Sequence, residues 1–148
     1  MDAAVLAADV DRYQQELVEL DAWMAEQFDQ VPPGRRDLVT NHHVFGYLAD
    51  RFGFTVVGAV IPSGTTLAAP SASDLDELAT SIRSAGVRTI FVDSAQPDRL
   101  AQVLAEQAAV DVAVTPLFTE SLSAAGEGAE TYLAMMRSNT EDIVAGLT

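Results

Sequence analysis

One stretch of the chain decides its fold: Asp37-Leu38-Val39-Thr40-Asn41-His42-His43-Val44-Phe45-Gly46-Tyr47. It contains both histidines of the protein. A short apolar run ends there in two polar residues, the two imidazoles follow, and a helix-like pattern comes next. We therefore expect the histidines to lie where a strand gives way to a helix. In open α/β sheets this edge is where ligands bind.

Upstream of this stretch, residues 3–29 have the pattern of one long helix. Apolar side chains recur at spacings of three and four, with Asp, Glu and Gln opposite. The apolar stripe consists of Leu6, Val10, Tyr13, Leu17, Leu20, Met24 and Phe28. Such a helix is about 40 Å long, comparable with the roughly 38 Å diameter of a compact chain of this length. We expect it to brace something beyond this domain, and Pro32-Pro33-Gly34 to end it.

Downstream, strand-like and helix-like patterns alternate. We expect strands at residues 38–40, 54–61, 88–92 and 110–115, and helices at residues 44–51, from Ser71 or Ser73 to about Gly86, at 98–107 and at 129–147. This alternation predicts a parallel sheet covered on both faces. The expected fold class is therefore α/β, a four-stranded parallel sheet with helices on both faces, preceded by a long N-terminal brace helix.

Composition limits the function. The 148 residues suffice for one well-filled domain. Acidic residues number 22 against 8 basic ones, and the net charge of −14 makes nucleic acid and anionic membranes poor partners. The absence of cysteine excludes thiolate metal sites. No stretch approaches the roughly 20 consecutive apolar residues of a membrane span, and residues 1–30 lack the basic-then-apolar order of a signal peptide.

Polar residues stand at the expected carboxyl ends of three strands. They are His42 and His43, Asp93 and Ser94, and Glu120 and Ser121. Carboxyl ends of parallel strands share one edge of a sheet, so these groups are expected to converge. Imidazole with carboxylate suits zinc, manganese or iron. The same residues are also compatible with plain capping and loop roles, because no short-range ligand motif such as His-Glu-x-x-His is present.

Three other chemistries have weaker support. The loop serines Ser63, Ser73, Ser94, Ser121 and Ser123 do not stand in a Gly-x-Ser-x-Gly elbow. The stretch Ser63-Gly64-Thr65-Thr66 lacks the phosphate-loop spacing, and the chain has no lysine. Residues 41–46 resemble the Asp-x-His-x-x-Gly of cobalamin-binding domains, with Asn41 in place of Asp, but a partner Gly-Gly loop is missing.

A further resemblance covers nearly the whole chain. The chain resembles the metal-binding receptors of bacterial zinc and manganese ABC importers, the TroA-like family. Four blocks in the same order carry it: Val39-Thr40-Asn41-His42-His43-Val44-Phe45-Gly46-Tyr47-Leu48, Ile90-Phe91-Val92-Asp93, Leu117-Phe118-Thr119-Glu120-Ser121-Leu122, and Thr131-Tyr132-Leu133-Ala134-Met135-Met136-Arg137-Ser138-Asn139. The segment from Tyr13 to Trp23 is similar to the long inter-lobe helix of that family.

The resemblance implies one lobe of a two-lobed metal-binding protein. Residues 1–31 would be the long inter-lobe helix and residues 35–148 the α/β C-terminal metal-binding lobe, with the metal held between two lobes. The family's ligands fall on His42 and on Glu120, which replaces the usual Asp. His43 stands where the family commonly has an acid or an amide, and Asp93 where it often has Glu. We expect Asp93 to support the ligands rather than to bind the metal, whereas His43 is expected either to support them or to help complete the site.

The same resemblance implies the biology. The bound ion would be zinc or manganese, carried as a transported ligand, with no catalysis. The partners would be the membrane permease of an ABC importer and an N-terminal lobe, which this chain lacks together with its two histidine ligands and its lipoprotein signal. The location would be extracytoplasmic, at the cell surface or in the periplasm. Two alternatives remain open: a small α/β enzyme that uses His42 beside Asp93, and a module that self-associates through its first helix, as a homodimer of the isolated lobe.

Overall fold

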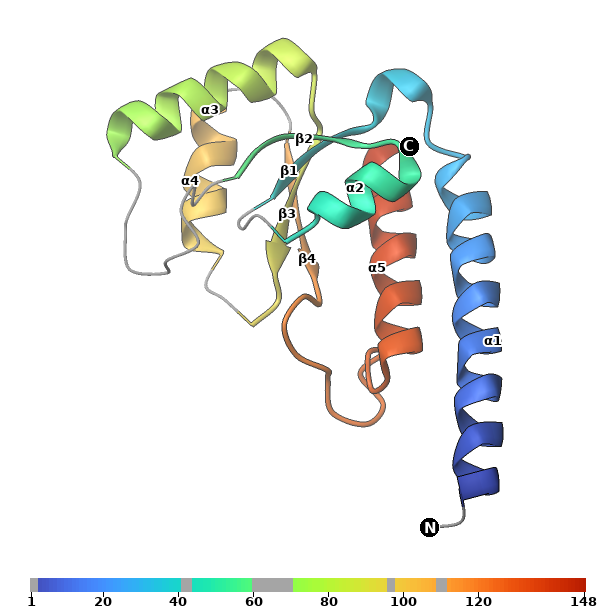
Figure 1. Ribbon diagram of the computed structural model, residues 1–148. Helices are drawn as coiled ribbons and strands as arrows, with labels where there is room; N and C mark the ends of the chain where they lie inside the picture. Colours follow the sequence, from blue (N-terminus) through green and yellow to red (C-terminus); the bar gives the residue numbers. More distant parts are fainter. Residues whose placement is uncertain (1–2, 41–43, 60–70, 96–97, 109–111) are drawn as a thin grey trace.

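The computed structural model describes residues 3–40, 44–59, 71–95, 98–108 and 112–148 of the chain (Figure 1). Its elements are α1 (Ala3–Phe28), a 3-10 turn (Pro33–Arg35), β1 (Asp37–Thr40), α2 (Gly46–Phe52), β2 (Thr55–Ala59), α3 (Ala72–Ala85), β3 (Thr89–Asp93), α4 (Arg99–Ala108), β4 (Ala113–Leu117) and α5 (Tyr132–Leu147). The strands form one parallel sheet in the order β2-β1-β3-β4. The predicted fold class is confirmed.

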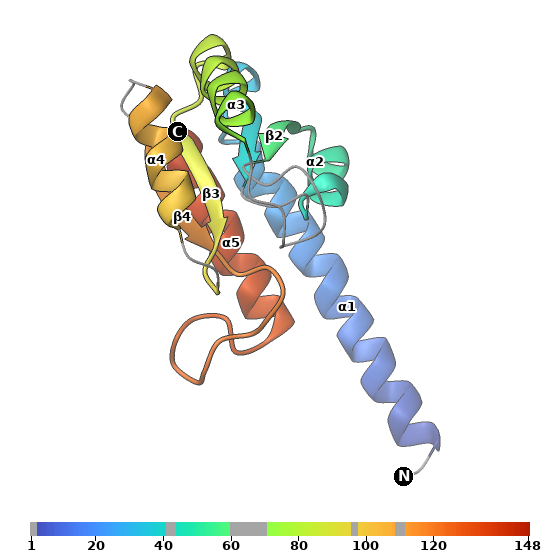
Figure 2. The ribbon, with the colours of Figure 1, turned by 90° about the vertical axis from the view of Figure 1, so that its left-hand side faces the viewer.

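Two buried clusters hold the sheet between its layers of helices. Strand residues alternate in direction, so that Leu38 and Phe91 join one cluster while Val39 and Ile90 join the other. The first cluster is closed by residues of α1, α2 and α5, and the second by residues of α3 and α4. Figure 2 shows the two groups of helices on opposite sides of the strands. Both faces are buried, as a parallel sheet requires.

The last strand and the last helix differ from their predicted bounds. The strand expected at residues 110–115 is observed as Ala113–Leu117 and includes Pro116, which pairs in register with Val92. Proline lacks a backbone N–H, but an edge strand tolerates it, and β4 is at the edge of the sheet. The helix expected from residue 129 begins at Tyr132, because the Thr131 hydroxyl accepts a hydrogen bond from the Ala134 amide (3.1 Å) and caps it.

The long helix α1 is buried along only part of its length. Leu20, Met24 and Phe28 are buried against the lobe, whereas Leu6 and Val10 of the same apolar stripe are 51% and 46% exposed. Figure 1 shows the amino-terminal turns of α1 extending past the end of α5, away from the sheet. No described helix combines the length and the apolarity that crossing a bilayer requires. The stripe therefore continues beyond the surface that this lobe covers.

Arg36 fastens the carboxyl end of α1 to the lobe. Its guanidinium donates hydrogen bonds to the backbone oxygens of Phe28 (2.9 Å), Val31 (3.1 Å) and Phe52 (3.0 Å). It also lies over the ring of Phe54, with Cζ 5.6 Å from the ring centroid. The last carbonyls of a helix have no partner within the helix. Phe28 and Phe52 end α1 and α2, so one arginine satisfies the ends of both helices.

Candidate metal centre

The strand order brings three carboxyl ends to one edge of the sheet. β1 lies beside β3, with Thr40 opposite Phe91, and β3 lies beside β4, with Asp93 opposite Leu117. After β1 the chain moves to β2 on one side and then crosses to β3 on the other. A topological switch point therefore lies between β1 and β3, which is where open α/β sheets bind ligands.

Asp93 is a buried carboxylate at this edge of the sheet. The residue is 3% exposed, at the carboxyl end of β3. Its Oδ2 accepts a hydrogen bond from the Thr119 hydroxyl, and its Oδ1 accepts one from the Ala95 amide at 2.6 Å. The carboxylate thus joins the segments that follow β3 and β4. The expectation that Asp93 supports the site rather than binds metal remains a prediction, with which this geometry agrees.

Asn139 of α5 holds the same segment from the other side, and it is not among the site residues expected from the sequence. Its Oδ1 accepts a hydrogen bond from the Phe118 amide (2.9 Å), and its Nδ2 donates one to the Phe118 carbonyl oxygen (2.6 Å). Asn139 is 3% exposed. A polar amide on the buried side of an otherwise apolar helix was the available signal, since a buried amide requires partners.

Glu120 follows this fastened segment directly and is exposed. Among the described residues, no hydrogen bond or ion pair engages its carboxylate. His42 and His43 lie outside the described residues, as does Asn41, so the meeting of His42 with Glu120 stays a prediction. Within the described ranges, no three histidine, aspartate or glutamate residues are grouped closely enough to hold a metal.

The loop after Glu120 is shaped by its own carboxylates. The Gly126 amide donates a hydrogen bond to Oε1 of Glu130 at 2.6 Å, and the Ala124 amide donates one to Oε2 of Glu127 at 3.2 Å. Hydrogen bonds from its own amide and from that of Gly126 lower the pKa of Glu130. Gly126 and Gly128 have φ values of 88° and 93°, a left-handed conformation that favours glycine. These acids hold the loop in shape.

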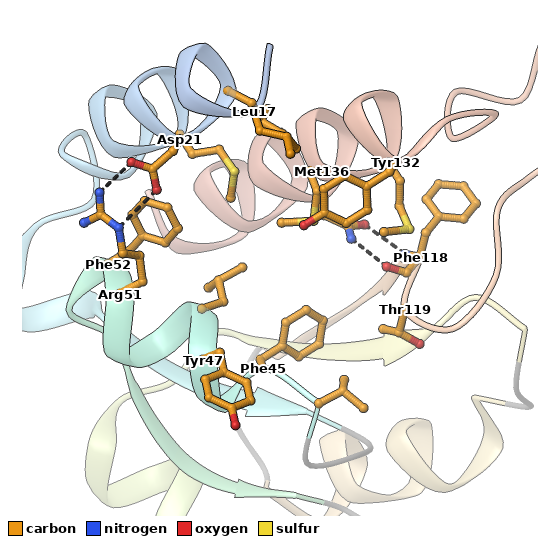
Figure 3. Close-up of a pocket in the computed structure, with 16 residues that line it drawn as sticks. Leu17, Asp21, Phe45, Tyr47, Arg51, Phe52, Phe118, Thr119, Tyr132 and Met136 are labelled. Carbon is orange, nitrogen blue, oxygen red and sulfur yellow. Dashed lines mark hydrogen bonds and ion pairs between the residues drawn. The ribbon is translucent and has the colours of Figure 1, made fainter. Parts of the chain in front are cut away.

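A groove of about 410 Å³ borders the site (Figure 3). It lies between α1, α2 and α5, and its walls are mainly apolar. The ion pair of Arg51 with Asp21 (2.5 Å) lies at one end of the groove and Thr119 at the other, and Asn139 also lines it. Asp93 does not line the groove. In the described part of the chain, the groove therefore lacks the carboxylate on which the enzyme alternative depends.

The described residues do not form a site for the three chemistries with weaker support, which are serine catalysis, phosphate binding and cobalamin binding. Ser94 and Ser121 are exposed. The Ser123 hydroxyl accepts a hydrogen bond from the Ala129 amide at 2.9 Å, as part of the loop, and Ser73 lies in the first turn of α3. The stretch 63–66 and the first residues of the cobalamin-like motif lie outside the described ranges.

Comparison with known proteins gives the class of the protein. The family model described as "Zinc-uptake complex component A periplasmic" (ZnuA) matches residues 1–146. The match spans nearly the whole chain, including α1 and all four strands. The chain belongs to this family.

Individual relatives agree. The chain is 34% identical over 139 residues to the zinc-binding protein TroA of Treponema pallidum, covering 91% of this chain and 44% of TroA. It is 25% identical over 146 residues to the manganese-binding lipoprotein MntA of Halalkalibacterium halodurans, covering 99% of this chain and 48% of MntA. The chain thus spans about half the length of these relatives.

Solved structures give the same result. The periplasmic zinc-binding protein TroA from Treponema pallidum superposes with a TM-score of 0.82 at 32% identity, over 93% of this chain and 50% of that one. A manganese-bound periplasmic metal-binding protein from Candidatus Liberibacter asiaticus superposes with a TM-score of 0.82 at 25% identity, over 96% of this chain and 52% of that one. The resemblance stated from the sequence is confirmed at the level of family and fold.

Proposed function

We propose that this chain binds a divalent transition metal, zinc or manganese, as the C-terminal lobe of the substrate-binding protein of an ABC importer. The observation that carries the proposal is the edge formed by β1, β3 and β4. There a fastened segment presents the exposed carboxylate of Glu120, at the edge where β1 ends shortly before His42 in the sequence. The relatives named above are a zinc-binding protein and a manganese-binding lipoprotein, which supports this proposal.

The ligand set proposed for this lobe is His42 and Glu120. Imidazole nitrogen and carboxylate oxygen both suit zinc and manganese. Zinc normally takes four ligands, so these two leave two positions to water or to groups supplied from elsewhere. With half the ligands present, we expect the isolated chain to bind zinc with a Kd on the order of micromolar to millimolar.

Calorimetric titration with zinc and with manganese tests the site. His42→Ala and Glu120→Gln should each abolish the saturable heat, because each removes one of two ligands. Glu106→Gln is the control: it removes an exposed carboxylate from α4 and changes the net charge by the same amount as Glu120→Gln does. This variant should bind zinc as the unaltered chain does. A nanomolar affinity that survives His42→Ala would refute the proposed ligands. Equal losses in Glu120→Gln and Glu106→Gln would mean that the metal responds only to net charge.

We further propose that a second α/β lobe covers the exposed apolar side of this one. Exposed apolar side chains lie on α1 (Leu6, Val10), and the exposed Tyr47 and Tyr132 line the groove. The twofold length of the relatives supports a lobe as the occupant.

Such an arrangement would place the metal between two lobes and present it to the membrane permease of the importer, outside the cytoplasm. The names of the relatives support this location, since they are periplasmic proteins or lipoproteins. The competing hypothesis is that a second copy of this chain covers the same apolar surface, as a homodimer of the isolated lobe.

Sedimentation velocity at several concentrations separates the two occupants. A surface evolved for another lobe should give weak association without a fixed stoichiometry, and Val10→Glu should reduce it because the charge interrupts the apolar stripe. Asp9→Asn, a change at a polar position on the same exposed helix, is the control. A discrete dimer with a micromolar dissociation constant, unaffected by metal and by His42→Ala, would instead support the homodimer. A strictly monomeric chain would contradict a covered surface.

A further inference from the structure

The segment that leads to Glu120 is fastened at three successive residues. The Leu117 carbonyl oxygen accepts a hydrogen bond from the Ser94 amide at 2.8 Å. Phe118 is bonded through its amide and its carbonyl by Asn139, and Thr119 is bonded through its hydroxyl by Asp93. Chain that has just left an edge strand normally loses its regular partners. Here each residue between β4 and Glu120 has one.

Asn139 acts as a two-point clamp. Its amide group donates to and accepts from the same residue, Phe118, which fixes both the position and the rotation of that peptide. The clamp is itself rigid, since Asn139 is 3% exposed and stands mid-helix in α5, beside the fully buried Thr140. A side chain with only a donor or only an acceptor could not hold the peptide at both atoms.

Asp93 provides the second, independent fastening. Its carboxylate is held from one side by the Ala95 amide and bonds the Thr119 hydroxyl on the other. This sets the direction in which the chain leaves Thr119. Because side chains on either side of the segment, from β3 and from α5, converge on consecutive residues, Glu120 leaves from a backbone of defined geometry although its own carboxylate is exposed.

We propose that Asn139 and Asp93, acting through Phe118 and Thr119, are the positioning residues of the Glu120 carboxylate in metal binding. The inference rests on the proposed function of this edge. Groups that orient metal ligands without touching the metal typically change affinity 10- to 100-fold when removed. The fastening therefore sets metal affinity through the direction of Glu120, and not through charge or through contact with the ion.

Thr119 offers the mildest test. Thr119→Val removes the hydroxyl with little change of shape, and Thr119→Ser keeps it. We expect Thr119→Val to weaken zinc binding about 10-fold or more by calorimetry, and Thr119→Ser to restore it. Thr140→Val is the matched control: this buried hydroxyl on α5 bonds only the Met136 carbonyl one turn earlier (2.7 Å) among the contacts described, so its loss should leave zinc affinity unchanged.

Amide hydrogen exchange in the metal-free protein gives a readout that does not depend on metal. Thr119→Val should speed exchange of the Phe118 amide, which donates to Oδ1 of Asn139 at 2.9 Å, about 10-fold or more by releasing the segment. Asn139→Asp should expose the Phe118 amide in the same way, because the carboxylate repels the Phe118 carbonyl oxygen that Nδ2 now bonds. Thr140→Val should leave exchange of the Phe118 amide unchanged.

The outcomes separate this inference from the proposed function. Zinc binding that depends on Glu120 but is the same in Thr119→Val would overturn the positioning role and leave the site intact. Equal weakening by Thr119→Val and Thr140→Val would reduce the effect to general stability and overturn it as well. Zinc binding indifferent to Glu120→Gln would overturn the proposed ligand, and the positioning role with it.

Discussion

Replacing Arg36 by methionine is expected to loosen the attachment of α1 to the lobe. Methionine keeps most of the aliphatic length and its packing on Phe54, but it cannot donate a hydrogen bond. The carbonyl oxygens of Phe28, Val31 and Phe52 then lose the donor that satisfies them at distances of 2.9 to 3.1 Å. Two helix ends are left with unpaired carbonyls in a partly buried place.

The size of the effect follows from these contacts. Hydrogen bonds to a charged group contribute about 1.5–3 kcal/mol each to stability. The Arg36 side chain is 20% exposed, so water can replace part of its role, and bonds from one group do not add fully. We expect the free energy of unfolding to fall by about 3–4 kcal/mol, which corresponds to roughly 10 °C in Tm for a domain of this size.

Urea unfolding followed by circular dichroism measures this change. Arg51→Met is the control: Arg51 also ties the lobe to α1, through Asp21 at 2.5 Å, but the two side chains are 58% and 44% exposed. Such a surface pair contributes at most about 1 kcal/mol. A loss below 1 kcal/mol in Arg36→Met, or an equal loss in Arg51→Met, would refute the assignment of the joint to Arg36.

Three further changes test other parts of the fold. Phe28→Ala should lower the free energy of unfolding, measured with denaturant, by about 3–5 kcal/mol. The residue is 1% exposed, and its ring meets the ring of Phe54 edge-on with the centroids 4.9 Å apart. A loss under 1 kcal/mol would contradict this packing. Ser71→Ala should lower stability by about 1 kcal/mol, since its hydroxyl caps α3, whereas Ser71→Asp should retain the cap. Partial burial raises the pKa of Asp142, so the native state binds this proton more tightly than the unfolded chain, and stability is lost as the pH rises through the native pKa. Asp142→Asn should therefore raise Tm at pH 7 but not at pH 3, and an equal gain at both would contradict the titration.

Most elements could be predicted because their signals are local. The run from Thr89 to Val92 is apolar or β-branched, follows a glycine-ended helix, and forms a strand that is buried throughout. Pro116 predicts an end of the fourth strand at residue 115, whereas the observed strand continues to Leu117. The sheet tolerates that proline only because β4 is at an edge, and local sequence does not carry strand order.

The burial of α1 shows a different limit. Its apolar stripe is continuous from Leu6 to Phe28, and periodicity alone marks both ends as equally suited to burial. Only the carboxyl-terminal half meets the lobe, so Leu20 is buried and Leu6 is not. Which half is covered depends on where α5 and α2 lie, and this is a long-range property.

The candidate site was predicted in part. Asp93 was identified because it ends a strand, and its buried position beside Thr119 follows from the adjacency of β3 and β4. Asn139 was not identified, although it belongs to a block on which the family resemblance rested. Periodicity places it on a helix, but nothing local pairs it with Phe118, 21 positions earlier.

The sequence by itself determined the α/β class, the alternation of strands and helices, and the placing of Asp93 at the end of a strand. These features depend on side-chain periodicity and on turn residues, which act over a few positions. Only the tertiary structure decided the strand order β2-β1-β3-β4 and the fastening of the segment before Glu120. The physical reason is that register and hydrogen-bond partners between distant segments are selected by joint burial of the whole sheet and its helices.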